Sequence, residues 1–174
     1  YPDTYVFTPG SSDLDILRRA AQAGRQTLDR LWAERDRDLP LETPYQALIL
    51  ASIVEKETGH GGDRARIAGV FINRLRIGMP LQTDPSVIYG MGDRYQGRLR
   101  KKDLEQDTPW NTYTRAGLPP TPIANPGKAA LMAATHPERH DYLYFVSRGD
   151  GTSEFSKNLS SHNQAVGKYI LKRN

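Results

Sequence analysis

An apolar run that ends in Glu-Lys-Glu-Thr-Gly at residues 48–59 constrains the fold of this chain more than any other feature. Thr43 and the glutamine three residues later have the spacing of a capping box, and Pro44 suits the first position of a helix. Gly59 suits the left-handed residue that often follows a last helical turn. The pattern therefore predicts a helix over residues 44–58.

Glu57 lies on the apolar side of this predicted helix. At about 100° per residue it falls on the stripe that includes Ile49 and Ile53, whereas Glu55 points about 200° away. The two carboxylates are therefore not expected to form a dyad. A carboxylate at the C-terminal end of a helix and beside aliphatic side chains favours its protonated form. Glu57 is thus a candidate general acid.

The simpler interpretation of Glu-Lys-Glu is a solvated helix end. An exposed C-terminal turn, however, more often carries Lys or Arg than two acids, because cations complement the helix dipole. A local departure from that preference points to a functional site.

Length and charge limit the remaining possibilities. The 174 residues suit one domain, and no segment approaches the roughly 20 apolar residues of a membrane-spanning helix. The net charge of +4 fits nucleic acid, anionic lipid or an anionic polymer such as a cell-wall glycan that carries peptide carboxylates. The sequence contains no nucleic-acid-binding motif, so we expect no nucleic-acid partner.

Several kinds of chemistry lack their sequence signatures. There is no cysteine, no Gly-x-Ser-x-Gly motif and no phosphate-binding P-loop, and the four histidines do not have the spacing of a zinc site. We expect no metal and no cofactor. The chain begins abruptly at Tyr1, so we expect it to be a portion of a longer protein.

Other periodic segments predict an α+β fold: a mainly helical domain over residues 1–174 with a short antiparallel β-hairpin and a loop-built substrate groove. Further helices are expected at residues 11–37, 63–77, 126–134 and 160–172, a helical turn at 101–105, and strands at 142–146 and 153–156.

Residues 78–127 are rich in Gly, Pro, Asp, Thr and Tyr and contain only short predicted elements. A stretch this long with little regular structure usually builds a binding surface. Amides and hydroxyls beside aromatic rings suit a sugar, which offers hydrogen bonds at its rim and an apolar face for stacking. Alternatively, each of these residues stabilises a local turn. The candidates are Gln82, Thr83, Asp84, Tyr89, Tyr95, Trp110, Asn111, Thr112 and Tyr113.

Several longer motifs occur together in one order. They span residues 51–58, 70–79, 81–90, 111–113, 117–120 and 158–163, with Pro-Asp-Thr-Tyr near the start of the chain. In this combination the sequence resembles the YceG-like family of endolytic murein transglycosylases.

The resemblance implies a bacterial enzyme that cleaves the bond between N-acetylmuramic acid and N-acetylglucosamine within peptidoglycan strands and leaves a 1,6-anhydro end. The family's catalytic acid, the Glu before Thr, corresponds to Glu57, which would act first as an acid and then as a base. Substrate contacts are expected from Asn111 and Tyr113, then Gln82, Asp84 and Tyr89, and less strongly from Ser161 and His162. A lysozyme-like arrangement around the catalytic helix is an expectation by analogy alone.

The resemblance implies that the full-length protein is anchored at the periplasmic face of the inner membrane and carries a LysM-like region. We therefore expect this sequence to be the catalytic portion alone. The resemblance also implies partnership with penicillin-binding-protein synthases, and we expect a monomer. Two alternatives stay open at this point: a hydrolytic muramidase that uses the same Glu57, and a non-catalytic glycan-binding module.

Overall fold

The computed structural model describes residues 1–171, which form an α+β fold, as the sequence predicts. These residues contain seven α-helices, one 3₁₀ turn and one two-stranded antiparallel sheet. The elements are α1 (Asp13–Glu34), α2 (Pro44–Glu57), α3 (Arg64–Arg76), α4 (Asp84–Met91), η1 (Gly92–Arg94), α5 (Lys101–Glu105), α6 (Lys128–Thr135), β1 (Tyr144–Ser147), β2 (Ser153–Ser156) and α7 (Leu159–Tyr169).

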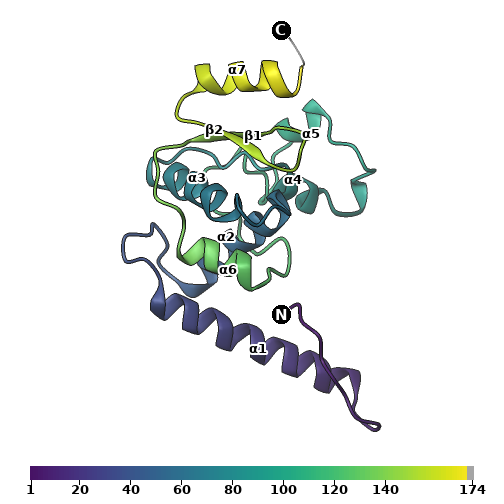
Figure 1. Cartoon of the computed structure of the whole chain (residues 1–174). Helices are drawn as coiled ribbons and strands as arrows, with labels where there is room; N and C mark the ends of the chain where they lie inside the picture. Colours follow the sequence, from purple (N-terminus) through teal and green to yellow (C-terminus); the bar gives the residue numbers. More distant parts are fainter. Residues whose placement is uncertain (172–174) are drawn as a thin grey trace.

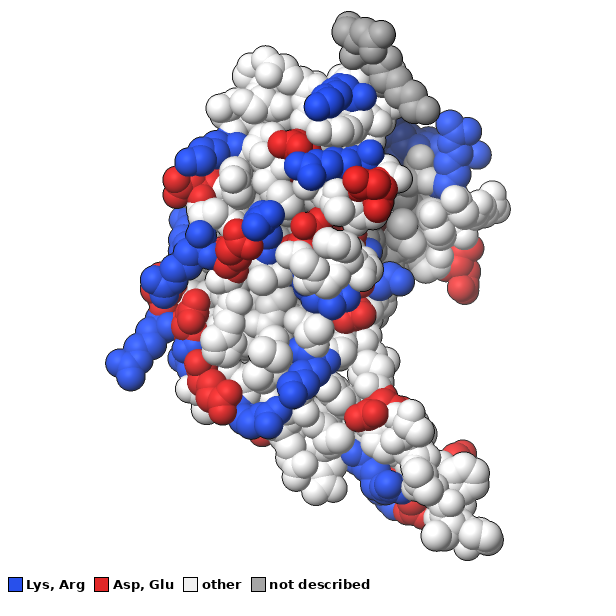
Figure 2. All heavy atoms as spheres, in the orientation of Figure 1, with Lys and Arg blue, Asp and Glu red and all other residues white. Residues whose placement is uncertain are grey.

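The helices are stacked around α2 (Figure 1). From top to bottom in that view, α7 covers the β-hairpin, the hairpin lies on α3, and α2 and α6 follow, with the long helix α1 below them. Helices α4 and α5 lie to one side, on the segment that the sequence predicts as a binding surface. Within the described part of the chain, every helix is too short or too polar to cross a lipid bilayer. Figure 2 shows basic and acidic side chains interspersed over the face in view.

The start of α2 agrees with its sequence signals. Pro44 is the first helical residue, and the hydroxyl of Thr43 accepts a hydrogen bond from the backbone N–H of Gln46 at 3.2 Å. The side chain of Gln46 accepts in turn from the backbone N–H of Glu42 rather than from that of Thr43. The cap therefore satisfies N–H groups on both sides of the helix start.

The end of α2 differs from the prediction by one residue. The helix ends at Glu57, because Thr58 is extended, with φ −146° and ψ 134°, and Gly59 does not adopt the predicted left-handed conformation. The hydroxyl of Thr58 accepts a hydrogen bond from the N–H of His60 and holds this turn. Glu57 is consequently the last residue of the helix, at its negative end.

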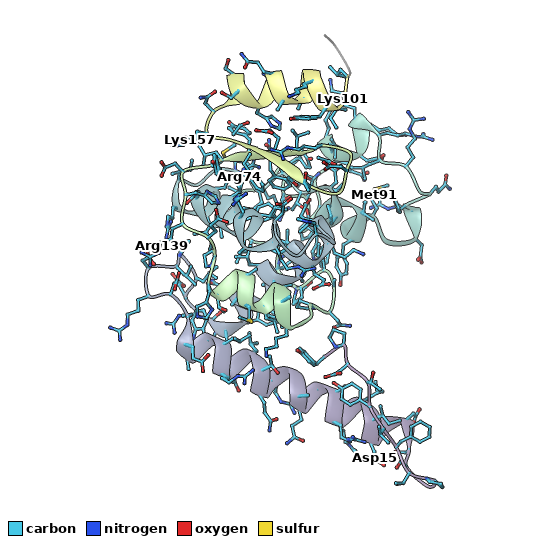
Figure 3. All side chains as sticks on the ribbon, viewed as in Figure 1. Asp15, Arg74, Met91, Lys101, Arg139 and Lys157 are labelled. Atoms are coloured by element: carbon cyan, nitrogen blue, oxygen red, sulfur yellow. The ribbon has the colours of Figure 1, made fainter. Side chains whose placement is uncertain are left out.

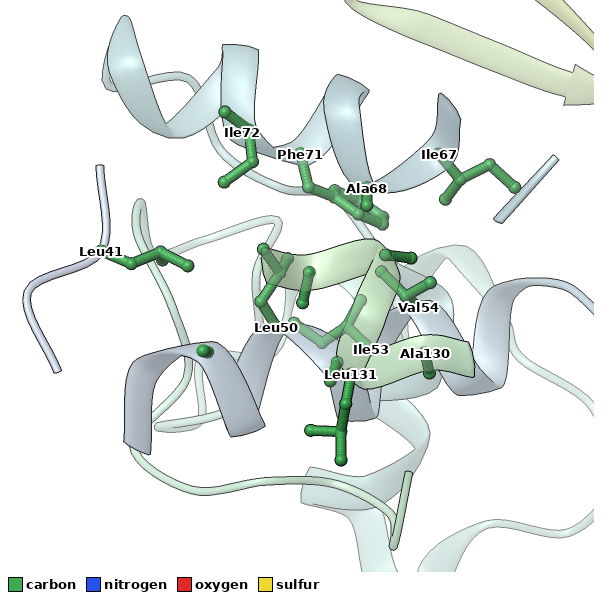
Figure 4. Packing of buried hydrophobic residues seen from close by; sticks show 14 of the residues in the cluster. Leu41, Leu50, Ile53, Val54, Ile67, Ala68, Phe71, Ile72, Ala130 and Leu131 are labelled. Carbon is green, nitrogen blue, oxygen red and sulfur yellow. The ribbon is translucent and has the colours of Figure 1, made fainter. Parts of the chain in front are cut away.

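The hydrophobic core lies where α2, α3 and α6 meet (Figure 4). Burying each aliphatic or aromatic side chain contributes about 1.5–3 kcal/mol relative to leaving it exposed. The apolar stripe predicted for α2 is fully buried and fixes the direction in which its last residue points. The central side chains are Leu50, Ile53, Val54, Ile67, Phe71, Ile72 and Leu131.

The hairpin is joined to α3 by aromatic packing and by one carboxylate. Phe145 of β1 pairs with Phe155 of β2 and packs edge-to-face on Phe71, with ring centroids 5.9 Å apart. Asp63 lies at the predicted N-cap position of α3, but its carboxylate accepts a hydrogen bond from Ser153 of β2 instead of capping the helix. These contacts hold the hairpin on α3.

Other predicted boundaries need small corrections. Helix α1 ends at Glu34 and not at residue 37, because Arg35 leaves the helical conformation. Helix α6 begins two residues later than predicted, and α7 ends at Tyr169; the predicted end at residue 172 lies outside the described residues. The first strand is Tyr144–Ser147 rather than 142–146, whereas the second strand and α5 lie where predicted.

Helix α4 is absent from the predicted elements. Its start carries a recognisable signal, since Thr83 occupies the N-cap position and Pro85 lies in the first turn. The dipeptide Asp84-Pro85 is equally typical of a turn, and the segment around it is rich in loop-forming residues, so the sequence pattern did not indicate a helix here. The structure shows that the same residues begin a helix of eight residues.

Candidate active site

A cavity of about 460 Å³ opens beside the C-terminal end of α2. Its wall combines α2, α3, the segment before α4, β1 and α7, so residues far apart in the sequence meet there. Figure 3 shows Arg74 between α3 and the hairpin, at one side of this region. The lining residues are Glu57, Arg74, Leu81, Gln82, Asp84, Tyr113, Tyr144, Phe145, Leu159, His162 and Asn163.

Glu57 is half-buried in this cavity, and its Oε1 accepts a hydrogen bond from the hydroxyl of Thr83. Burial raises the pKa of Glu57 from 4.5 to about 7, because the charged carboxylate loses solvation. The Thr83 hydrogen bond opposes this increase, the negative charge of Asp84 adds to it, and the positive charge of Arg74 opposes it. At neutral pH Glu57 therefore populates both its protonated and its ionised form.

Glu55 is separate from this site, as the helix periodicity predicts. Its Oε2 accepts a hydrogen bond from the backbone N–H of Gly127, at a distance of 3.1 Å. Gly127 is the N-cap of α6, where a negative charge is favourable. Glu55 thus stabilises the junction of α2 and α6 and does not face Glu57.

Asp84 and Tyr113 form a second polar group on the cavity wall. The phenol O–H of Tyr113 donates a hydrogen bond to Oδ1 of Asp84 at 2.6 Å. Burial and this hydrogen bond raise the pKa of Tyr113, so the phenol keeps its proton and remains a donor. Both residues are among the predicted substrate contacts, and the structure places both in the cavity.

Gln82 also lines the cavity, from an unusual backbone conformation. Its φ is 51°, the one positive value among the non-glycine residues that the structure describes. Its N–H donates to the carbonyl of Thr112 at 3.0 Å, which ties the segment before α4 to the loop that carries Tyr113. Such strained residues persist where the surrounding structure requires them, often at functional sites.

Arg74 is a site residue that the sequence analysis did not select. An arginine is usually exposed, yet this residue is only 6% exposed. Its guanidinium donates to the carbonyls of Leu143 and Leu81, each at 2.7 Å, and lies 5.3 Å from the ring centroid of Tyr144. Burial lowers the pKa of Arg74, but an arginine remains charged, so a cation faces the cavity.

His162 lines the cavity, whereas its neighbour Ser161 does not. The His162 ring stacks on Tyr144 with centroids 5.1 Å apart, and burial and Arg74 together lower its pKa. The imidazole is therefore neutral at neutral pH. Ser161 is exposed, and its backbone N–H donates to the side chain of Asn158, the N-cap of α7. The structure thus brings only the histidine of this pair to the site.

Asn111 and Tyr89 do not reach the cavity wall, contrary to the predicted substrate contacts. Asn111 is completely buried: its amide donates to the carbonyls of Leu104 and Gln106 and accepts from the N–H of Tyr113. Every polar atom of Asn111 therefore serves the loop that presents Tyr113. Tyr89 is 46% exposed and packs against Trp110, outside the set of lining residues.

The site as a whole contains one acid poised near neutral pH, a second carboxylate held by a phenol, a buried cation and aromatic rings. Protonated carboxyl groups next to a polar cavity are suited to proton transfer to a bound substrate. The cavity is also open enough, and polar enough, for hydroxyl-bearing rings to enter.

Comparison with known proteins identifies the family of this chain. The model of the YceG-like family matches residues 1–168. The endolytic murein transglycosylase of Bacillus subtilis (strain 168) is 41% identical over 175 residues, covering all of this chain and 48% of that protein. The endolytic murein transglycosylase of Streptococcus pneumoniae (strain R6) is 32% identical over 157 residues, covering 82% of this chain and 28% of that protein.

A solved structure is also similar. The crystal structure of a yceG-like protein from Listeria monocytogenes aligns with a TM-score of 0.76 and 38% sequence identity, over 94% of this chain and 52% of that one. The chain therefore spans about half, or less, of the length of these relatives. The family match over nearly all of its length shows that the chain belongs to the YceG-like family.

Proposed function

We propose that this chain is the catalytic portion of an endolytic murein transglycosylase, which cleaves glycan strands of peptidoglycan internally. The observation that carries the proposal is Glu57, half-buried in a polar cavity with its pKa raised to about 7. The names of the related proteins support the choice of substrate and reaction class.

In the proposed reaction, one carboxyl group performs both proton transfers. Protonated Glu57 gives its proton to the glycosidic oxygen that leaves with the N-acetylglucosamine residue, while the bond from that oxygen to C1 of the N-acetylmuramic acid breaks. The resulting carboxylate then removes the proton from the C6 hydroxyl of the same N-acetylmuramic acid as O6 attacks C1. The new C1–O6 bond gives a 1,6-anhydro end, Glu57 is protonated again, and no water is consumed.

The surroundings of Glu57 suit both halves of this cycle. A general acid works best when its pKa lies near the working pH, because it must hold a proton and also release it. The hydroxyl of Thr83 stabilises the carboxylate between the two steps. The negative charge of Asp84 has the opposite effect, because it raises the pKa of Glu57 and so favours the protonated form. Asp84, Gln82 and His162 provide polar atoms around the sugar, and we propose them as substrate contacts.

The proposal is tested by digesting purified glycan strands and weighing the products by mass spectrometry. The expected products of the unmodified chain end in anhydro sugars, which are lighter than hydrolysis products by one water. Glu57→Gln is expected to keep its fold and yield no such ends, while Glu55→Gln keeps the activity, because Glu55 faces α6. Anhydro ends formed at the normal rate by Glu57→Gln would refute the assignment.

A hydrolytic muramidase is the second candidate, and Asp84 is the observation that favours it. Ordinary glycoside hydrolysis uses two carboxyl groups, one as acid and one as base or nucleophile, and Asp84 lines the same cavity as Glu57. Products heavier by one water would identify this reaction. If the chain were a glycan-binding module without activity, it would yield neither product, and the Glu57→Ala variant would bind glycan strands as the unmodified chain does.

Three further proposals come from the family resemblance. They are anchoring at the periplasmic face of the inner membrane, action beside penicillin-binding-protein synthases, and a monomeric state. Each concerns the longer protein. They can be tested by fractionation, by co-purification and by measurement of mass in solution.

A further inference from the structure

A second cavity, about 260 Å³ in volume, lies at the far end of α4 and is strongly basic. Four cationic side chains and one acidic side chain line it, together with Met91 and Gln96. The charged lining residues are Arg94, Arg98, Arg100, Lys102 and Asp103, which we call the basic cluster.

The cations of the basic cluster are available to a ligand. Within residues 1–171, no salt bridge joins Arg94, Arg98, Arg100 or Lys102 to an acidic side chain. Asp103, the acid in the lining, accepts a hydrogen bond from the backbone N–H of Arg100 at the start of α5. An excess positive charge therefore faces this cavity.

Helix α4 fixes the position of the basic cluster relative to the candidate active site. Asp84, its first residue, lines the Glu57 cavity, and Met91, its last residue, lines the basic one. Residues seven apart lie on the same face of a helix, two turns and roughly 10 Å from one another. In Figure 3, Met91 and Lys101 lie toward the same side of the molecule, beyond the region of Arg74. The two cavities are therefore about two helical turns apart, a span that a polymer in the Glu57 cavity can bridge to reach the basic cluster.

We propose that the basic cluster binds the carboxylate groups of the stem peptides on a glycan strand whose sugars occupy the Glu57 cavity. The proposal rests on the proposed function, because peptidoglycan strands carry such peptides beside every N-acetylmuramic acid. The planar guanidinium of arginine suits carboxylates, to which it can donate two parallel hydrogen bonds. The cluster would thus make the chain prefer strands that still carry peptides over strands from which they have been removed.

The test compares two substrates: strands with intact stem peptides, and the same strands after an amidase has removed the peptides. The variant is Arg98→Gln/Arg100→Gln, since both side chains are exposed and neither supports the fold through a side-chain hydrogen bond within the described residues. The matched control is Arg30→Gln/Arg37→Gln, which removes the same charge at and just after α1, at the other end of the molecule.

The measured quantity is the ratio of kcat/KM for peptide-bearing strands to that for peptide-free strands. The ratio is expected to exceed one in the unmodified chain and in the control. In Arg98→Gln/Arg100→Gln it falls by roughly three- to tenfold, the size expected for two exposed charge pairs, and the difference shrinks at high salt. A ratio of one in the unmodified chain, or an unchanged ratio in the variant, would overturn the proposal.

Binding of both kinds of strand to Glu57→Gln, measured by co-sedimentation, separates this inference from the proposed function. If the unmodified chain cleaves neither strand but Glu57→Gln still binds peptide-bearing strands better, the reaction is wrong and the subsite stands. If cleavage occurs without any preference in binding or rate, the subsite is wrong and the reaction stands. Polyphosphate serves as a third ligand: if the double substitution weakens its binding and leaves the strand preference intact, the cluster recognises phosphate and the proposal fails.

Discussion

The hydroxyl of Thr83, at the start of α4, donates a hydrogen bond to the carboxyl group of Glu57, the last residue of α2. This contact joins the two segments on which the candidate site depends. It also stabilises the ionised form of a carboxyl group that burial otherwise keeps protonated.

Thr83→Val should shift the pH dependence of activity toward higher pH. The hydroxyl lowers the pKa of Glu57, so its removal raises that pKa above its value of about 7. Because the reaction begins with protonated Glu57, activity falls as the pH rises through this pKa, and the falling limb moves upward in the variant. The measurement is kcat/KM against pH. Thr4→Val, at an exposed position, is the control, and an identical falling limb in Thr83→Val would contradict the account.

Glu57→Gln should be more stable than the unmodified chain at pH 8. The pKa of Glu57 is raised from 4.5 to about 7 on folding, so the folded state retains a proton that the unfolded state releases between these values. Stability from this group is complete below pH 4.5 and is lost as the pH rises to about 7, by at most about 3 kcal/mol. Glutamine resembles the protonated form and has no such loss.

Urea unfolding at several pH values measures this difference. The advantage of Glu57→Gln should grow between pH 5 and about 7.5 and then level off, whereas Glu42→Gln, at an exposed position, should follow the unmodified chain. A variant that is less stable at every pH would show that the Glu57 carboxylate is well accommodated in the folded state.

The success with Glu57 shows what sequence reasoning can reach. Helix periodicity, a Thr-Pro start and a buried apolar stripe are local properties, and they placed Glu57 at the end of the correct helix and on its buried side. The hairpin was equally local, since a run of aromatic and β-branched residues followed by a Gly-rich turn indicates two antiparallel strands. These parts of the fold could be predicted because each is specified by neighbours in the sequence.

The wall of the cavity could not be predicted in the same way. Arg74 reaches the site because residues about 70 positions later supply a carbonyl, from Leu143, and a ring, from Tyr144 at the start of β1. Asn111 has a residue type that binds sugars well, yet the fold of its own loop turns the amide inward to three backbone groups. The pattern of residue types in the sequence does not show which polar side chains face the solvent and which hold a loop.

Asn111→Ala should destabilise the fold by about 2–4 kcal/mol, because it empties a buried position and leaves two part-buried carbonyl groups and the N–H of Tyr113 without their partner. Activity should fall with it, since the loop that presents Tyr113 is no longer held. Denaturant unfolding and steady-state kinetics measure the two effects, with Asn125→Ala, at an exposed position, as control. Unchanged stability with a raised KM would instead make Asn111 a direct ligand of the substrate.

Gln82→Val should destabilise the fold by roughly 1–2 kcal/mol, because a β-branched residue is poorly accommodated at a φ of 51°. Gln82→Gly should retain most of the stability, since glycine adopts this conformation without strain. Thermal unfolding compares the two variants. If valine and glycine have the same effect, the backbone at residue 82 is not strained.

The most direct measurement of the central claim is a carbon-13 NMR titration of the Glu57 carboxyl group in the chain labelled at glutamate, with Glu57→Gln used to assign its signal. The account predicts a titration midpoint near 7, well above those of exposed glutamates. A midpoint near 4.5 would mean that Glu57 is ionised at neutral pH and cannot be the acid that begins the reaction.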